Sequence, residues 1–259
     1  MKRLWKWVTL VGIVVLMLAA CSNDADLAEG SDSATSGEGT SGDKPLQVVT
    51  SFTIIADIAR EIGGEDVEIH NLVPTGTDPH EYEPLPEDIK KATDADVLFY
   101  NGLNLEGGKE GWFFKMIDSV GQQEENIYNL TERVEPMYLS GTGGKEEEIN
   151  PHAFIDPAVG IKMAEDMRDA LMEIDPDNKE NYEQRANVYL ERLNEIDQDY
   201  AERINEIPEE NRVLVTSERA FQYMADHYGL EEAFIWEVDT EENGSPDPIP
   251  PFVDFLRLR

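Results

Sequence analysis

The pattern of apolar and polar residues in the first half of the chain alternates between two periods. Short apolar runs bounded by turn residues predict strands at 47–50, 67–73 and 96–100. Apolar residues three or four positions apart predict helices at 52–62, 86–93 and 110–120. Strands that alternate with helices are typical of a parallel sheet covered on both faces, so we expect an α/β fold. In such sheets ligands bind in the loops beyond the carboxyl ends of the strands.

Individual residues refine the prediction for two of these helices. Ser51 stands where its side chain can cap the first helix, and Gly63 with Gly64 can end it. The helix at 110–120 carries an apolar stripe that we expect to be buried. This stripe consists of Trp112, Phe113, Met116 and Ile117.

One long helical pattern dominates the second half of the chain. After an amphipathic stretch at 158–173 and a break at 175–177, apolar residues keep helical spacing from 178 to about 207. About thirty helical residues would span about 45 Å, which suits a strut between two lobes. A coiled-coil helix with a partner is the alternative, although the apolar stripe is not a clean heptad. The stripe consists of Tyr182, Ala186, Tyr189, Leu193, Ile196 and Tyr200.

A shorter pattern follows Pro208, which ends the long helix. It predicts a strand at 212–216, a helix at 221–228 and a strand at 231–236. One strand–helix–strand unit cannot cover its own sheet, so we expect the second lobe to be incomplete in this chain.

The N-terminus is typical of a secretion signal. Positive residues precede an apolar run at 8–18 that is too short to span a bilayer comfortably. The run ends in Leu18-Ala19-Ala20-Cys21, which resembles the lipobox of bacterial lipoproteins. Cys21 is the only cysteine, so we expect it to be lipidated, with an ordinary signal peptide as the alternative. The polar stretch at 22–44 should form a flexible tether.

These observations divide the chain into five expected segments. They are a signal peptide at 1–20, the lipidated Cys21 with a disordered tether at 21–45, an N-terminal lobe at 46–177, a linking helix at 178–207 and a partial C-terminal lobe at 208–259.

The net charge of -34 excludes one class of partner. Nucleic acid would be repelled, so we expect none to bind. Acidic surfaces are also common on proteins in salty or alkaline surroundings, and we attribute most of the negative charge to an environment of this kind. A negative field would concentrate divalent cations, but salt screens it beyond about 8 Å. The charge is therefore compatible with a metal ligand without demonstrating one.

The candidate chemistry lies in two matched dipeptides and one glutamate. The chain has four histidines, and two of them follow proline in a loop, as Pro79-His80 and Pro151-His152. Glu218 lies at the carboxyl end of a predicted strand. Two imidazoles and a carboxylate brought together from distant loops can bind a divalent metal. His70, within a strand pattern, and His227, near a helix end, are not expected to be ligands.

Two other interpretations of His80, His152 and Glu218 compete with metal binding. Each residue alone could have a local structural role, such as a loop histidine bonded to backbone. A metal-dependent hydrolase also uses two histidines and a carboxylate with an open coordination position. The sequence contains no H-E-x-x-H, Gly-x-Ser-x-Gly or phosphate loop, so we expect a binding protein and not an enzyme.

Several motifs together resemble a known family. They are the lipobox, Thr50-Ser51-Phe52, the stretch 76–84 with His80, Asn101 to Glu106, Asn150 to Phe154 with His152, Thr216-Ser217-Glu218 and Trp236-Glu237. In combination, over about 46–246, they resemble the metal-binding lipoproteins of bacterial ABC importers, the cluster A-I solute-binding proteins for manganese, zinc or iron.

The resemblance implies a fold, a ligand set and partners. The fold would be two Rossmann-like α/β lobes joined by one long helix, with the metal between them. His80 and His152 match the histidine ligands of the first lobe, and Glu218 matches the first ligand position of the second. The fourth ligand, an aspartate, would fall beyond Arg259. The expected protein is an extracytoplasmic monomer, anchored to the cell membrane by its lipid, that delivers metal to an ABC importer permease.

The third ligand position bears on which metal is bound. Zinc members resembling this chain usually have a histidine there, and often a histidine-rich loop before the second histidine ligand. This chain has Glu218 and, at 146–148, three glutamates. A carboxylate hardens the site, so we expect Mn²⁺, with Zn²⁺ and Fe²⁺ as alternatives. A surface adhesin is a further alternative, since lipoproteins of this type lie at the cell envelope.

The chain also departs from the family pattern. Arg219 follows Ser217-Glu218 where a small residue is usual, and closely spaced prolines at 246–251 replace an expected helix start. We therefore expect a truncated or frame-shifted product, or a fragment of a longer gene.

Overall fold

The structure is a computed structural model that describes residues 44–139 and 149–236. All of them belong to one compact unit at 41–259. The predicted signal peptide, Cys21, the tether and the glutamates at 146–148 lie outside the described residues. Among the residues that are described, none of the helices has the length and apolar character needed to cross a membrane.

The first lobe is built on a parallel sheet, as the sequence predicted, and the sheet has four strands. Its strands are β1 (Leu46–Thr50), β2 (Val67–Asn71), β3 (Val97–Tyr100) and β4 (Ile127–Asn129). They lie in the order β2-β1-β3-β4. The chain leaves β1 toward one neighbour and later returns to the other, so the carboxyl ends of β1 and β3 flank a topological switch point. Strand β4 was not predicted, because three residues are too few to show a period.

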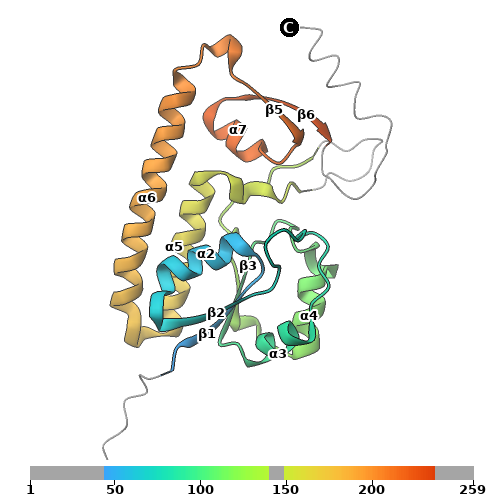
Figure 1. The fold of residues 1–259 in the computed structure, drawn as a ribbon, viewed down its shortest axis with the longest axis vertical. Helices are drawn as coiled ribbons and strands as arrows, with labels where there is room; N and C mark the ends of the chain where they lie inside the picture. Colours follow the sequence, from blue (N-terminus) through green and yellow to red (C-terminus); the bar gives the residue numbers. More distant parts are fainter. Residues whose placement is uncertain (1–43, 140–148, 237–259) are drawn as a thin grey trace, which may run out of the picture. The chain divides into compact units, whose positions relative to one another are not determined.

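Four helices cover the two faces of this sheet. They are α2 (Thr53–Gly63), α3 (Pro86–Asp94), α4 (Trp112–Val120) and α5 (Pro157–Ile174). Figure 1 shows α2 and α5 on one side of the sheet and α3 and α4 on the other. The predicted stripe of α4 is buried along its whole length. Short 3₁₀ turns among the described residues are η1 (Gly64–Asp66), η2 (Gly108–Glu110), η3 (Glu124–Asn126), η4 (His152–Ile155), η5 (Pro176–Asn178) and η6 (Glu209–Asn211).

The prediction that Ser51 caps α2 is wrong. Phe52 is the N-cap residue and makes no capping bond through its side chain. The Ser51 hydroxyl instead donates to Glu106 Oε1 at 2.7 Å. Glu106 is 2% exposed and also accepts from the backbone N–H groups of Asn101 and Gly102. A buried carboxylate is therefore satisfied by groups at the carboxyl ends of β1 and β3, and it ties these two strand ends together.

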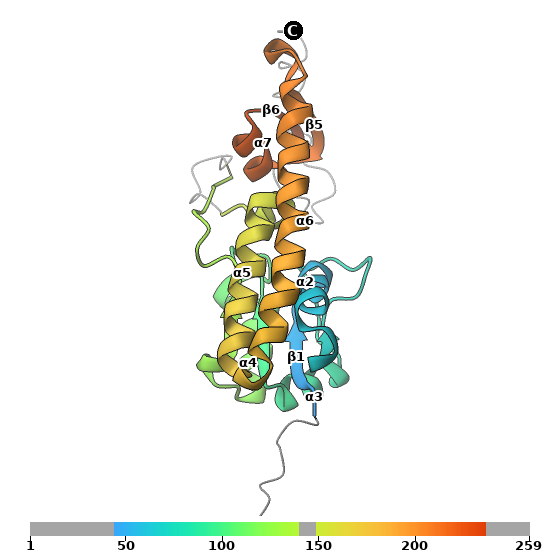
Figure 2. The ribbon, with the colours of Figure 1, turned by 90° about the vertical axis from the view of Figure 1, so that its left-hand side faces the viewer.

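The long helix α6 (Lys179–Asn205) lies along α5 and α2, as both ribbon views show (Figures 1 and 2). Its apolar stripe is buried only in the first half. Tyr182 is fully buried against the first lobe, whereas Ile196 and Tyr200 are 45% and 42% exposed. The helix thus packs on the first lobe for its first turns, and farther along it contacts α7 (Gln222–Tyr228), where the Tyr228 hydroxyl donates to Asp197 at 2.7 Å.

The second lobe, as far as it is described, is one strand–helix–strand unit. Strand β5 (Val213–Glu218) pairs in parallel with β6 (Glu231–Trp236), and α7 (Gln222–Tyr228) connects them. Gly229 ends α7 at a φ of 67°, a left-handed conformation that glycine adopts without strain. The unit places Glu218 at the carboxyl end of β5, where the sequence predicted it.

Candidate metal site

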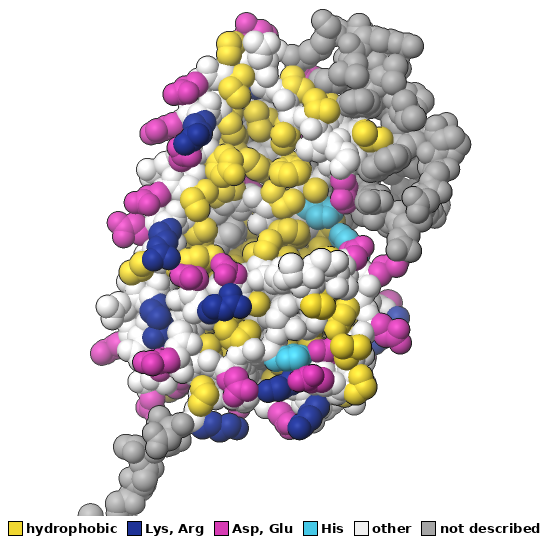
Figure 3. Space-filling view, in the orientation of Figure 1, with side chains coloured by type: hydrophobic (Ala, Val, Ile, Leu, Met, Phe, Trp, Pro, Cys, Tyr) yellow, Lys and Arg dark blue, Asp and Glu magenta, His cyan; other side chains and the backbone are white. Residues whose placement is uncertain are grey.

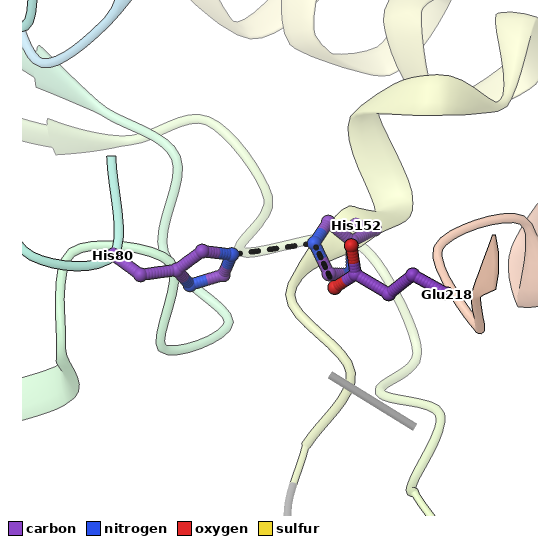
Figure 4. Close-up of side chains that lie close together, drawn as sticks. All are labelled: His80, His152 and Glu218. Atoms are coloured by element: carbon purple, nitrogen blue, oxygen red, sulfur yellow. Dashed lines mark hydrogen bonds and ion pairs between the residues drawn. The ribbon is translucent and has the colours of Figure 1, made fainter. Parts of the chain in front are cut away.

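The structure brings His80, His152 and Glu218 together (Figure 4). His80 Nε2 lies 3.3 Å from His152 Nε2, and His152 Nε2 lies 3.4 Å from Glu218 Oε1. One potential ligand atom from each residue lies within 4.8 Å of the others. The three residues come from the loop after β2, from η4 and from the end of β5. They are far apart in the sequence, with 72 positions between the two histidines alone, so only the fold can make them neighbours.

The spacing of these atoms suits a shared ion. Ligand atoms about 2.1 Å from a metal lie about 3.0–3.4 Å apart in octahedral or tetrahedral geometry. The two measured distances, 3.3 and 3.4 Å, are close to this range. Two imidazole nitrogens and a carboxylate oxygen form the mixed donor set that divalent transition metals accept.

The loop that carries His80 is fixed on both sides of the histidine. The His80 backbone N–H donates to Asp78 Oδ1 at 2.8 Å, and the Trp112 indole donates to the carbonyl of Pro79 at 2.9 Å. Farther along, the Tyr82 hydroxyl donates to Asp88 Oδ2 at 2.7 Å. The Tyr82 and Trp112 rings also pack edge to face, 5.2 Å apart. This loop therefore presents His80 from a braced backbone.

The tautomer of His152 follows from its neighbour Asn150. The backbone N–H of His152 can only donate, and it points to Asn150 Oδ1 at 3.1 Å, so this atom of the amide is the oxygen. The same oxygen lies 2.9 Å from His152 Nδ1, which must then carry the proton. Nε2 is left with its lone pair directed toward His80 and Glu218. A hydrogen bond of this kind orients ligating histidines in many metal sites.

The charge state of His152 also suits a ligand. The side chain is 6% exposed. Burial, with a smaller contribution from the neighbouring His80, lowers the pKa of His152 to about 4. The imidazole is therefore neutral at neutral pH, which is the form that binds a metal.

Glu218 reaches the group from the second lobe. Its side chain is 24% exposed, so this part of the group is open to solvent. The next residue, Arg219, forms an ion pair with Glu232 at 3.1 Å and lies over the Phe234 ring. The arginine that departs from the family pattern thus has packing of its own within the second lobe.

The other two histidines lie outside this group. His70 Nε2 lies 2.7 Å from Asp88 Oδ1, and His227 Nδ1 lies 2.9 Å from Asp156 Oδ1. Asp88 also accepts from Tyr82 of the His80 loop, and Asp156 directly follows η4, so both histidines pair with carboxylates that support the segments around the group.

Sequence reasoning did not single out the residues that hold the ligands in place. In the sequence, Asn150 belongs to a motif and Trp112 to an apolar stripe, and nothing in the pattern distinguishes Asp88. Asn150 directly precedes the Pro-His dipeptide, which is a signal that could have identified it. The contacts of Asp88 and Trp112 with the His80 loop have no counterpart in spacing along the chain.

The surface around the group is mixed in character. Figure 3 shows histidine side chains next to an acidic one, beside apolar surface that continues toward α6. Acidic side chains are scattered over the same face, and basic ones lie among them (Figure 3).

Comparison with known proteins supports the class that the fold and site define. The family model described as "Zinc-uptake complex component A periplasmic" (ZnuA) matches residues 48–259. The metal ABC transporter substrate-binding lipoprotein SsaB of Streptococcus sanguinis is 42% identical over 258 residues, covering 99% of this chain and 79% of SsaB. The manganese ABC transporter substrate-binding lipoprotein PsaA of Streptococcus mitis is 41% identical, with the same coverages.

A comparison with solved structures also finds a metal-binding protein. The Mn-bound periplasmic metal-binding protein of candidatus liberibacter asiaticus superposes with a TM-score of 0.72 at 28% identity, covering 83% of this chain and 76% of that one. The class is that of substrate-binding proteins of ABC metal transporters, which are not enzymes. The chain belongs to the ZnuA family, and the resemblance inferred from its motifs is confirmed.

Proposed function

We propose that His80, His152 and Glu218 bind one divalent transition-metal ion as cargo and that the protein delivers this ion to an ABC permease. The observation that carries the proposal is the approach of the three ligand atoms to within 4.8 Å, from elements in both lobes. The neutral, oriented His152 supports it, because an ion-binding imidazole must keep a free lone pair.

We infer that the cargo is Mn²⁺. Glu218 adds a hard oxygen donor to two nitrogens, which favours manganese or ferrous iron relative to an all-histidine set. PsaA, whose name records manganese, supports the inference. The family description records zinc, and affinity in general rises from manganese toward zinc, so Zn²⁺ is the second candidate.

We also propose that Cys21 is lipidated and holds the protein, as a monomer, on the outer face of the cell membrane. The lipobox motivates this proposal, and the names of the relatives as lipoproteins support it. The Cys21→Ala variant should be released into the medium. Retention of this variant on the membrane after signal removal would show that the anchor lies elsewhere.

The cargo site is tested by metal titration of the full-length chain in detergent, with Mn²⁺ and Zn²⁺ measured separately. An ion that binds only the folded state stabilises it by about 2.7 kcal/mol at a hundred times Kd. We expect His80→Ala to lose most of the resulting thermal shift. Tyr182→Phe is the control, because the hydroxyl it removes donates to Asp175, at the opposite end of α5 from the group, and the shift should be retained. Equal shifts in wild type and His80→Ala would refute the site.

A further inference from the structure

We propose that Asn150 is a positioning residue that joins the two lobes at the metal site, so that the position of Glu218 depends on Asn150. This inference rests on the proposed function. It adds a residue that ligates nothing itself but holds one ligand from each lobe in relation to the other. Asn150 is fully buried and lies in the segment that leads into η4.

The Asn150 side chain faces the first lobe with one end and the second lobe with the other. Its Oδ1 accepts from the backbone and ring N–H groups of His152, as described above. Its Nδ2 donates to the carbonyl of Arg219 at 2.8 Å and to Gln222 Oε1 at 2.9 Å. Arg219 directly follows Glu218, so a single amide contacts the ligand His152 and the backbone beside the ligand Glu218.

The orientation of this amide is fixed by its partners. The His152 backbone N–H can only donate and the Arg219 carbonyl can only accept. Rotating the amide by 180° would therefore place a donor against the His152 N–H and an acceptor against the Arg219 carbonyl. All four hydrogen-bonding positions of the side chain are used. The backbone of Asn150 is held as well, because its N–H donates to Met137 and its carbonyl accepts from the Tyr223 hydroxyl, at 2.8 and 2.9 Å.

These contacts have a consequence for binding. A ligand from the second lobe contributes to affinity only if it is held at the right distance from the ligands of the first. Among the described contacts, the amide of Asn150 makes the connection nearest to both His152 and Glu218. If the side-chain part of this connection is broken, His80 and His152 keep their geometry, while the backbone beside Glu218 loses a bond that fixes it relative to His152; the bond from Tyr223 to the Asn150 carbonyl remains. Glu218 should then contribute less to the binding of the ion.

Asn150→Asp distinguishes the role of the amide oxygen from the role of the amide nitrogen. The new carboxylate still accepts from His152 and preserves its tautomer, but its second oxygen faces the Arg219 carbonyl, which is also an acceptor. A carboxylate also makes the histidine a stronger donor to the metal, so the net change in affinity is not informative. The informative quantity is how much Glu218 contributes in each background, measured by a double-mutant cycle.

The experiment titrates Mn²⁺ into full-length wild type, Glu218→Gln, Asn150→Asp and the double variant. We expect Glu218→Gln to lower affinity by about tenfold or more in wild type and by less than about threefold in the Asn150→Asp background. Tyr182→Phe is the control: it removes a partly buried hydrogen bond to Asp175, at the end of α5 away from the site, and should leave the effect of Glu218→Gln unchanged.

The outcomes separate this inference from the proposed function. If wild type binds Mn²⁺ and Glu218→Gln has the same effect in both backgrounds, Asn150 does not position Glu218 and the inference is overturned. If wild type binds no ion, or if His80→Ala changes nothing, the proposed function fails first. Should Asn150→Asp not fold, Gln222→Met removes one of the two bonds on the second-lobe side. In that variant a reduced effect of Glu218→Gln supports the inference, and an unchanged effect overturns it.

Discussion

At the scale of single residues, burial keeps the His152 imidazole neutral, and one hydrogen bond selects its tautomer. Its context in the sequence, a histidine after proline in a loop, predicted a possible ligand. Its protonation and tautomer could not be predicted, because both depend on Asn150 and on the loss of solvent around the ring. Ser51 illustrates the same limit. Its position before a helix predicted a cap, but a buried carboxylate 55 residues away binds its hydroxyl instead.

The depressed pKa of His152 predicts a pH dependence of stability in the absence of metal. The pKa is about 4 in the folded protein and 6.5 in the reference state. Between these values the unfolded chain binds more protons, so stability is present above about pH 6.5 and is lost as the pH falls toward 4. From pH 7.5 to 5 the loss from this one group is about 2 kcal/mol.

The measurement is urea unfolding with chelator at these two pH values. Other groups titrate as well, so the comparison is with His152→Gln, which keeps a polar side chain that does not titrate. The loss of stability between pH 7.5 and 5 should be smaller in this variant by about 2 kcal/mol. The same loss in both proteins would show that His152 is not kept neutral by the fold.

At the scale of elements, apolar periodicity was sufficient to predict a helix or strand that is long and packed on one side. The predicted helices correspond to α2, α3, α4, α5, α6 and α7, with ends displaced by a few residues. The three-residue strand β4 was missed because pairing with β3 maintains it, and pairing is not visible in its own sequence. The long helix was predicted as a strut, but only the structure shows where it is attached.

Arg185 is one polar attachment of α6 to the first lobe. Its guanidinium donates to the carbonyls of Ile62 and Gly63, at the end of α2, and pairs with Asp66 at 2.6 Å. Arg185→Met should lower the free energy of unfolding by about 1.5–3 kcal/mol, since partly buried acceptors lose a charged donor. Arg203→Met on the same helix is the control. Its pair with Asp199 is exposed, so the change should cost clearly less than Arg185→Met. Equal costs in urea unfolding would mean that α6 is not anchored at Arg185.

At the scale of the whole described unit, the function depends on contacts between parts that are distant in sequence. Alternating strands and helices predicted a parallel sheet, and binding in the loops after strands is general for such sheets. The meeting of His80 and His152 with Glu218 was inferred from their matched contexts and from the family resemblance, because periodicity carries no information on how β5 is placed against η4. The residues that hold this arrangement, Asn150 above all, are known only from their contacts.

If the ion joins both lobes, its effect should reach the second lobe. Mn²⁺ ligated by His80, His152 and Glu218 would link the end of β5 to the first lobe, and opening of β5 and α7 would then require the ion to lose a ligand. Hydrogen exchange in Val213–Glu218 and Gln222–Tyr228 should therefore slow on addition of Mn²⁺, in proportion to occupancy. Glu218→Gln should lose this protection at an ion concentration that restores full occupancy of the histidines, whereas Tyr182→Phe should keep it. Protection confined to the first lobe in wild type would mean that Glu218 is not a ligand and that the histidines alone hold the metal.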